Sequence, residues 1–117
     1  MTRQEAYKLG HKGEGLAALY LRVKGYRILA RRYKTHVGEA DLVARRGNAL
    51  VFVEVKARKT LNEGLNSITE RQKKRVVRAA EYYLAENPKS AALDIRFDAI
   101  IVLPGLKIKH LKDAWQT

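Results

Sequence analysis

Two apolar runs joined by a short turn constrain the fold of this chain more than any other feature of its sequence. Residues 39–45 and 49–58 are rich in valine, leucine and other residues that favour strands, and Arg46-Gly47-Asn48 lies between them. A turn of two residues, either Gly47-Asn48 or Arg46-Gly47, makes the two runs an antiparallel hairpin. The sequence therefore predicts a sheet that contains this hairpin.

Either turn places four charged side chains on one face of the hairpin. With Gly47-Asn48 as the turn, Asp41 lies opposite Glu54, and with Arg46-Gly47, Glu39 lies opposite Glu54. In both registers the charged face carries Glu39, Asp41, Glu54 and Lys56. The other face carries Ala40, Leu42, Val51, Val53 and Val55. We disfavour a turn of three residues, because a shift of one residue would move Asp41 to the face of the valines.

Carboxylates that face each other on neighbouring strands destabilise a sheet unless something offsets their charge. A divalent cation with oxygen ligands would do so: Asp41 and Glu54 would hold Mg²⁺ or Mn²⁺, and the Val55 carbonyl could add a backbone oxygen. Such an ion polarises a phosphate and lowers the pKa of a bound water. Lys56 points at the same place, where it could position or deprotonate that water or stabilise charge on the phosphate. The alternative is that Lys56 only neutralises the two acids in a surface ion-pair cluster.

The charge balance points to a polyanionic partner. The chain has 24 Lys and Arg against 12 Asp and Glu, a formal net charge of +12, which favours nucleic acid over a membrane surface. The acid-free stretch 15–38 contains Arg31 and Arg32. A predicted helix at about 70–86 carries more basic residues on one face, at spacings of three and four: Arg71, Lys74, Arg75 and Arg78. A phosphate backbone would relieve their repulsion, whereas the alternative is a solvated helix face.

The absence of cysteine excludes disulfides, thiol nucleophiles, zinc fingers and iron–sulfur clusters. It also fits a cytoplasmic setting. The first residues contain no apolar segment typical of a signal peptide, and the longest apolar runs are too short to span a bilayer. We therefore expect a cytoplasmic protein with no membrane partner.

The remaining pattern predicts one α/β domain over residues 1–117, of which we expect about the first 10 to be flexible. Helices are predicted at about 11–24 and 70–86, and strands at 26–35, 39–45, 49–58 and 95–103, with a short strand at 107–111. Residues 59–67 are expected to form a polar loop. The order is α-β-β-β-α-β, with three antiparallel strands and a crossover to the fourth, which gives a mixed sheet flanked by helices.

The residues of the predicted hairpin, together with most of the chain, resemble a known family. Gly38-Glu39-Ala40-Asp41 followed by Val53-Glu54-Val55-Lys56 resembles the PD-(D/E)xK nuclease signature. Most of the chain, from Gly13-Glu14 to Ala114-Trp115, resembles the bacterial YraN-like, endonuclease-like family. That family is similar to archaeal Holliday junction resolvases and has a restriction-endonuclease-like fold. The resemblance implies an αβββαβ core and an active site that uses Mg²⁺ and consists of Glu14, Asp41, Glu54 and Lys56.

Three further residues each allow two interpretations. Glu14 lies on the apolar stripe of its helix, where it either belongs to the site or stabilises the dipole in the first helical turn. Glu39 either adds a ligand or faces solvent. Gln72 either points toward the site or caps its helix, since Thr69-x-x-Gln72 is a capping box, as is Ser67-x-x-Glu70. The three histidines show no metal-ligand spacing, and we interpret them as surface or fold residues: His11, His36 and His110.

These features predict a Mg²⁺- or Mn²⁺-dependent endonuclease that hydrolyses DNA, with recognition of backbone and shape. Branched DNA is implied by the resemblance alone, and a junction substrate suggests a homodimer with one site for each of two strands. The alternative is a non-catalytic nucleic-acid-binding module that keeps the nuclease fold. A weaker third hypothesis is a basic protein associated with ribosomes or membranes.

Overall fold

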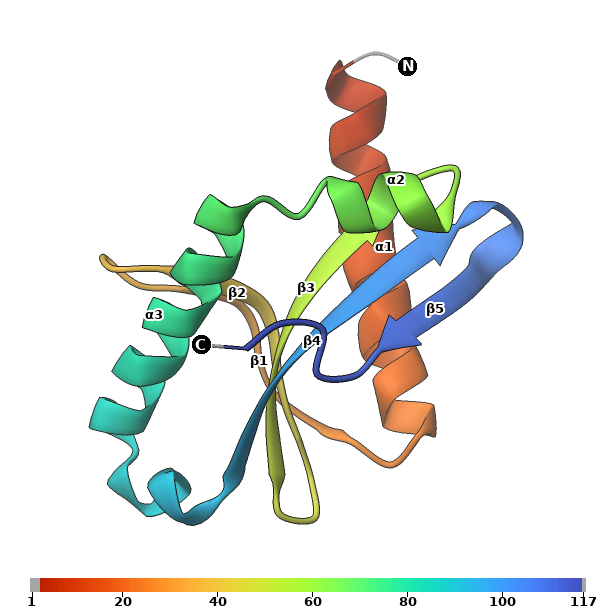
Figure 1. Ribbon diagram of the computed structural model, residues 1–117. Helices are drawn as coiled ribbons and strands as arrows, with labels where there is room; N and C mark the ends of the chain where they lie inside the picture. The colour runs from red at the N-terminus through yellow and green to blue at the C-terminus, as the bar shows by residue number, and fades with distance from the viewer. Residues whose placement is uncertain (1–2, 117) are drawn as a thin grey trace.

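The computed structural model describes the backbone of residues 3–116 and the side chains of residues 13–116. A five-stranded sheet has the order β1-β2-β3-β4-β5. Its strands are β1 (Arg27–Lys34), β2 (Glu39–Arg46), β3 (Ala49–Ala57), β4 (Asp94–Leu103) and β5 (Lys107–Leu111). The α-helices are α1 (Arg3–Val23), α2 (Leu61–Asn66) and α3 (Glu70–Glu86), and two 3₁₀ turns, η1 (Pro88–Ala92) and η2 (Pro104–Leu106), flank β4 (Figure 1).

The pairing of the strands confirms the predicted hairpin and mixed sheet. Arg46 pairs with Ala49 and Val43 with Phe52, so Gly47-Asn48 is the turn, and Gly47 has the positive φ of 58° that such a turn requires. β1 with β2 and β2 with β3 are antiparallel. β4 lies parallel to β3 after the crossover through α2 and α3, and β5 is antiparallel to β4.

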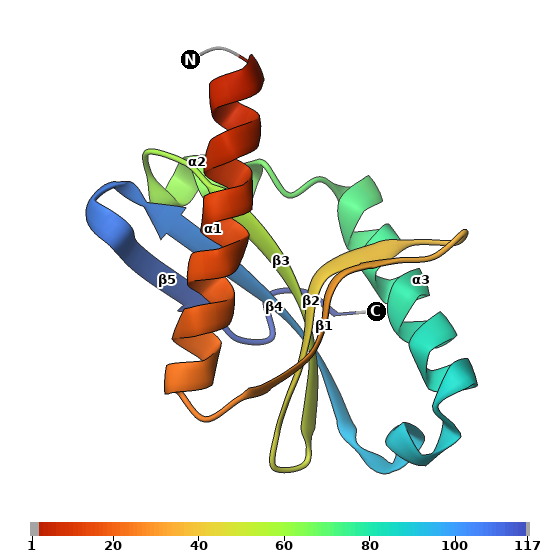
Figure 2. The same cartoon turned by 180° about the vertical axis from the view of Figure 1, so that it is seen from behind.

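A helix covers each face of the sheet. On one face α1 packs Ala17 and Leu21 against a cluster that includes Leu42 and Val53. On the other face α3 packs Val76 and Ala80 against a second cluster, which includes Phe52 and Ile101. Figure 2 shows the molecule from the α1 side, with α3 beyond the β1–β2 hairpin. The central strands β2, β3 and β4 are therefore largely buried from both sides, and a charged side chain within them is unusual.

The alternation of faces predicted for β2 is wrong at Ala40. Ala40 packs in the α3-side cluster together with Val43, although the predicted alternation places it with Leu42. The pairing of β1 with β2 is irregular in this region: a register shift lies between Ile28 and Ala30, and Arg32 has a left-handed φ of 51°. Irregularities of this kind alter the alternation of faces along a pair of strands.

Two helices differ from the sequence prediction. α1 begins at Arg3 rather than near residue 11, so residues 3–10 are helical. The expectation that about the first 10 residues are flexible stays a prediction. The same expectation for Met1 and Thr2 lies outside the described residues. The predicted polar loop at 59–67 contains α2, which begins where the Thr60 side chain accepts a hydrogen bond from the Glu63 backbone N–H at 3.1 Å.

The start of α3 confirms one of the two predicted capping boxes. The Thr69 hydroxyl accepts from the Gln72 N–H, and Gln72 Oε1 accepts from the Thr69 N–H, each at 3.1 Å. Ser67 instead donates its hydroxyl to the Gly64 carbonyl at 2.7 Å, at the end of α2. In residues 3–116 no helix is both long and apolar enough to cross a membrane.

Candidate active site

The predicted carboxylate pair lies where β2 and β3 separate. The ladder between these strands ends at Leu42 and Val53, one position before Asp41 and Glu54 would pair. Beyond it, Asp41 turns toward β3, and its Oδ2 accepts a hydrogen bond from the Val55 N–H at 2.7 Å. The Glu54 carboxyl is hydrogen-bonded to Asp41 and is only 8% exposed. The structure thus brings these two predicted ligands together.

The environment of Glu54 disfavours its ionised form. Burial raises the pKa of Glu54 most, and the hydrogen bond to Asp41 and the charge of Asp41 raise it further, to about 9. The positive charge of Lys56 lowers this pKa but does not offset the other effects. At neutral pH and without a cation, Glu54 therefore keeps its proton beside Asp41.

Glu14 approaches the pair from α1. It is 7% exposed, and its carboxylate oxygens lie 3.5 Å from Arg31 Nε and 3.2 Å from Arg32 Nε. Burial raises the pKa of Glu14 most, followed by the charge of Asp41, whereas Arg31 lowers it. Because α1 begins at Arg3, Glu14 lies well inside the helix, and the dipole interpretation is wrong. Both arginines are still about half exposed, so they can also face a ligand.

The other predicted residues are placed as follows. Lys56 is half-buried, and its positive charge lowers the pKa of the nearby Glu54. This proximity fits both the catalytic interpretation of Lys56 and the ion-pair interpretation. Glu39 is exposed, with its Oε1 at 3.9 Å from Arg75 Nε. Gln72 is engaged in the capping box, so its capping interpretation is confirmed.

The donor set fits a hard divalent cation, although it is small. Among residues 13–116, no three His, Asp or Glu side chains group closely enough to hold a metal ion. The oxygens of Glu14 face Arg31 and Arg32 instead. Mg²⁺, however, is commonly held by one or two carboxylates and completes its shell with water and substrate phosphates. Asp41 and Glu54 supply that many, and the Val55 carbonyl remains a predicted ligand.

The predicted basic face is part of α3. Arg71, Lys74 and Arg78 are exposed on this helix, and Arg75 is half-buried beside Glu39. Gly38 lies so close to the helix that a Cβ at this position would collide with the Arg75 carbonyl. This contact fixes the β1–β2 turn, and with it the start of the strand that carries Asp41, against the basic helix.

Sequence reasoning missed a buried polar network around Asp98, which is fully buried on β4. Its oxygens accept from Arg96 Nε and Nη2 at 2.8 and 2.9 Å and from the Asp113 N–H at 3.0 Å, and His110 Nε2 lies 2.7 Å away. Arg96 also bonds to the Tyr26 hydroxyl at 2.7 Å. His110 is therefore a fold residue. The available signal was Arg96-x-Asp98 within an otherwise apolar strand.

A mixed sheet between helices, with an acidic pair where two antiparallel strands part, defines a restriction-endonuclease-like α/β domain. Residues 13–102 match the uncharacterised protein family UPF0102, and the chain belongs to this family. UPF0102 is the YraN-like, nuclease-like family that the sequence resembles.

The chain is similar to UPF0102 proteins of several bacteria. It is 50% identical to one from Chelativorans sp. (strain BNC1), over 98% of this chain and 93% of that protein. It is 47% identical to one from Mesorhizobium japonicum, over 97% and 91% respectively. A UPF0102 protein of Parvibaculum lavamentivorans is 50% identical, over 98% of this chain and 86% of its own length.

Proposed function

We propose that this protein is a Mg²⁺- or Mn²⁺-dependent endonuclease that hydrolyses phosphodiester bonds of DNA. The observation that carries the proposal is the hydrogen-bonded pair Asp41–Glu54, buried beside Lys56 where β2 and β3 separate. Burial beside Asp41 raises the pKa of Glu54 to about 9. The fold therefore disfavours the negative charge on Glu54, which a bound cation would stabilise. Perturbed carboxyls of this kind are concentrated at functional sites.

Each residue of the site has a role in this proposal. Asp41 and Glu54 hold the cation, and the Val55 N–H fixes the orientation of Asp41. A divalent cation, when bound, polarises the phosphate and lowers the pKa of water. Lys56 orients the attacking water and donates to a phosphate oxygen as negative charge develops there. The water oxygen then bonds to phosphorus and gives up a proton to solvent, while the bond from phosphorus to the leaving sugar oxygen breaks and that oxygen takes up a proton from solvent.

The charge of the molecule supports DNA as the substrate. The exposed cations of α3, Arg71, Lys74 and Arg78, with Arg75 beside them, would contact phosphates and position the duplex without reading its sequence. Arg31 and Arg32 carry positive charge to the edge of the carboxylate site through their contacts with Glu14. Branched DNA, and a homodimer that cuts two strands, follow from the resemblance to junction-resolving enzymes. We place this activity in the cytoplasm.

Cleavage assays test the proposal. Labelled branched, single-stranded and duplex DNA would be incubated with the wild type and Mg²⁺ or Mn²⁺, and nicked products would be measured. We expect cleavage that is lost in Asp41→Ala and Glu54→Ala and retained in Glu63→Ala, which removes an exposed carboxylate on α2. Equal cleavage by the wild type and by either site variant would show that the mechanism is wrong.

A non-catalytic nucleic-acid-binding module is the second candidate function. Two observations favour it: the net charge of +12, and the lack of a three-residue metal cluster among residues 13–116. This alternative predicts salt-sensitive binding of DNA or RNA without turnover in any divalent metal. Calorimetry separates the two functions, because a Mn²⁺ site that depends on Asp41 and Glu54 is expected only for the enzyme.

A further inference from the structure

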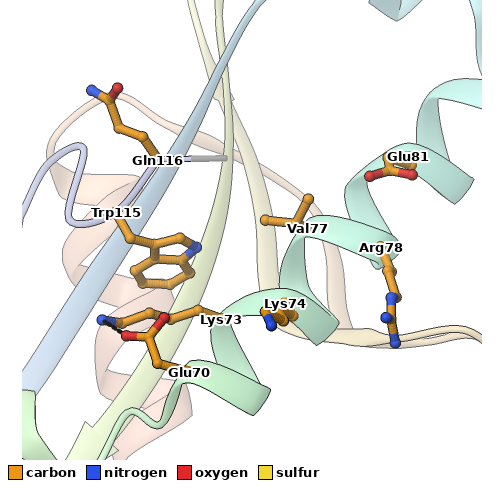
Figure 3. A pocket seen from close by; sticks show the side chains of 8 residues that line it. All are labelled: Glu70, Lys73, Lys74, Val77, Arg78, Glu81, Trp115 and Gln116. Atoms are coloured by element: carbon orange, nitrogen blue, oxygen red, sulfur yellow. Dashed lines mark hydrogen bonds and ion pairs between the residues drawn. The ribbon is translucent and has the colours of Figure 1, made fainter.

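A pocket of about 420 Å³ lies between α3 and the C-terminal residues Trp115 and Gln116 (Figure 3). The helix contributes three basic side chains, two acidic ones and Val77 to its lining: Lys73, Lys74, Arg78, Glu70 and Glu81. Asp41, Glu54 and Lys56 do not line this pocket. Glu14 approaches those residues from α1, which covers the opposite face of the sheet. The pocket is therefore distinct from the candidate active site.

One wall of the pocket is formed by Trp115, the single tryptophan of the chain. Its ring is 8% exposed and stacks on Phe97, with 6.0 Å between the ring centroids. Its Nε1 is the only buried side-chain nitrogen or oxygen among residues 13–116 that has no hydrogen-bond partner. Figure 3 shows this nitrogen on the edge of the ring that is turned toward α3. A buried donor without a partner indicates a place for an oxygen acceptor that is not part of this chain.

The opposite wall offers further donors. Lys73 is paired with Glu70 at 3.1 Å, so its charge is already offset. Lys74 and Arg78 are exposed and form no ion pair within the part of the chain whose side chains are described. Glu81 also lines the pocket and forms no ion pair among the described side chains, and the Gln116 amide oxygen is a further acceptor. The two cations and the indole N–H, which are donors only, outnumber these acceptors and leave an excess of positive charge. A ligand that complements them presents oxygen acceptors and negative charge.

We propose that this pocket binds a phosphate group of a nucleic-acid strand, with Lys74, Arg78 and the Trp115 N–H as its donors. The choice of nucleic acid rests on the proposed function, and it is supported by Arg71 and Arg75 on the same helix. Residues three and four apart on a helix lie about 5–6 Å from each other, so these side chains form a continuous row of positive charge. A polymer with one charge per nucleotide fits such a row better than a single anion does. Because the Trp115 N–H is covered, binding must shift the side chains over it.

The single tryptophan makes binding directly observable. The full chain, in EDTA to prevent cleavage, would be titrated with an oligothymidylate of about 12 nucleotides, a length within the range of single-strand sites. Trp115 fluorescence would report occupancy. We expect a saturable change with the oligonucleotide, and with inorganic phosphate only at far higher concentrations. The absence of any change with the oligonucleotide would overturn the proposal.

Two variants test the donors by anisotropy of a labelled oligonucleotide. Trp115→Phe keeps an aromatic ring on Phe97 but removes the N–H, and it should weaken binding about fivefold without lowering Tm. Lys74→Gln/Arg78→Gln should weaken binding at least tenfold more than Lys107→Gln/Lys109→Gln, which removes two exposed cations from β5. Unchanged affinity in Trp115→Phe, or equal losses in the two double variants, would contradict the assigned roles.

Further titrations distinguish nucleic acid from other ligands of the pocket, and the pocket from the active site. A polyglutamate peptide that binds as tightly as the oligonucleotide would overturn the proposal in favour of an acidic protein partner, and equally tight inorganic phosphate would favour a free anion. Asp41→Asn should leave the Trp115 response unchanged, and loss of that response would show that the two sites are not distinct. Failure of the wild type to cut DNA would refute the proposed activity alone, because the fluorescence titration requires no cleavage.

Discussion

Replacing Glu54 by glutamine should stabilise the metal-free protein at neutral pH. Burial and the neighbouring Asp41 raise the pKa of Glu54 from 4.5 to about 9. Between these two values the folded protein holds a proton that the unfolded chain has released. The stability contributed by this group is therefore fully present below pH 4.5 and decreases as the pH rises toward 9. Glutamine is never charged, and its amide can keep the hydrogen bond to Asp41.

The magnitude follows from the pH interval. At pH 7 the interval above the unfolded pKa is 7 − 4.5 = 2.5 units, which at about 1.4 kcal/mol per unit corresponds to about 3 kcal/mol. Glu54→Gln should recover much of this free energy of unfolding at pH 7 and almost none at pH 4.5. For a domain of this size the gain corresponds to an increase in Tm on the order of 10 °C.

Urea unfolding followed by circular dichroism, in EDTA and at several pH values from 5 to 8, measures the effect. The difference in the free energy of unfolding between Glu54→Gln and the wild type should grow steadily with pH. Glu63→Gln, a change at an exposed carboxylate, should show no such trend. A difference that stays constant with pH, or a variant less stable than the wild type at pH 8, would refute the reasoning about the buried pair.

Five other outcomes are expected. Mn²⁺ binding at pH 7 should release about one proton, because Glu54 must ionise to become a ligand. Calorimetry in buffers of different ionisation enthalpy should detect this proton in the wild type but not in Asp41→Asn. Asp98→Asn should cost about 3–5 kcal/mol in urea unfolding, because it leaves Arg96 without its buried partner. Burial alone would raise the pKa of Asp98, but hydrogen bonds from His110 and Arg96 lower it below 3.8. The stability that this group contributes should therefore be lost only as the pH falls through the lowered pKa. Acid titration followed by circular dichroism should show this loss in the wild type and not in Asp98→Asn. Gly38→Ala should lower stability by about 1–3 kcal/mol through collision with the α3 backbone, and Thr69→Ala by about 1 kcal/mol through loss of the cap, both measured as shifts of the urea midpoint.

Local patterns predicted the parts of the fold that local interactions determine. The turn Gly47-Asn48 fixes the register of β2 and β3, and the capping box of Thr69 and Gln72 fixes the start of α3. The same kind of signal, Thr60-x-x-Glu63, precedes α2 and could have identified that helix within the predicted loop. Its short length and its glycine obscured it.

Features that depend on distant segments were not predictable from the sequence. The left-handed φ of Arg32 has no local signal, because arginine does not favour that region, and no local signal indicates the face on which Ala40 packs. The contacts of Glu14 depend on how α1 lies across β1. The hairpin register brings Asp41 near Glu54, and the hydrogen bond from the Val55 N–H holds Asp41 there beyond the end of the ladder. The metal ligation and catalytic roles of these residues remain predictions.

The Asp98 network has a consequence for the order in which the chain folds during synthesis. β1, β2 and β3 can pair as soon as they leave the ribosome, because they are joined by short turns. The network, in contrast, depends on distant segments, because its Arg96–Tyr26 hydrogen bond joins residues 70 positions apart. His110 and the Asp113 N–H supply two of the contacts to Asp98. Until residues 110–113 have been made, Asp98 lacks half of the contacts that stabilise its charge. The buried charge on β4 is therefore fully stabilised only after the segment that carries His110 and Asp113 has folded back against this strand.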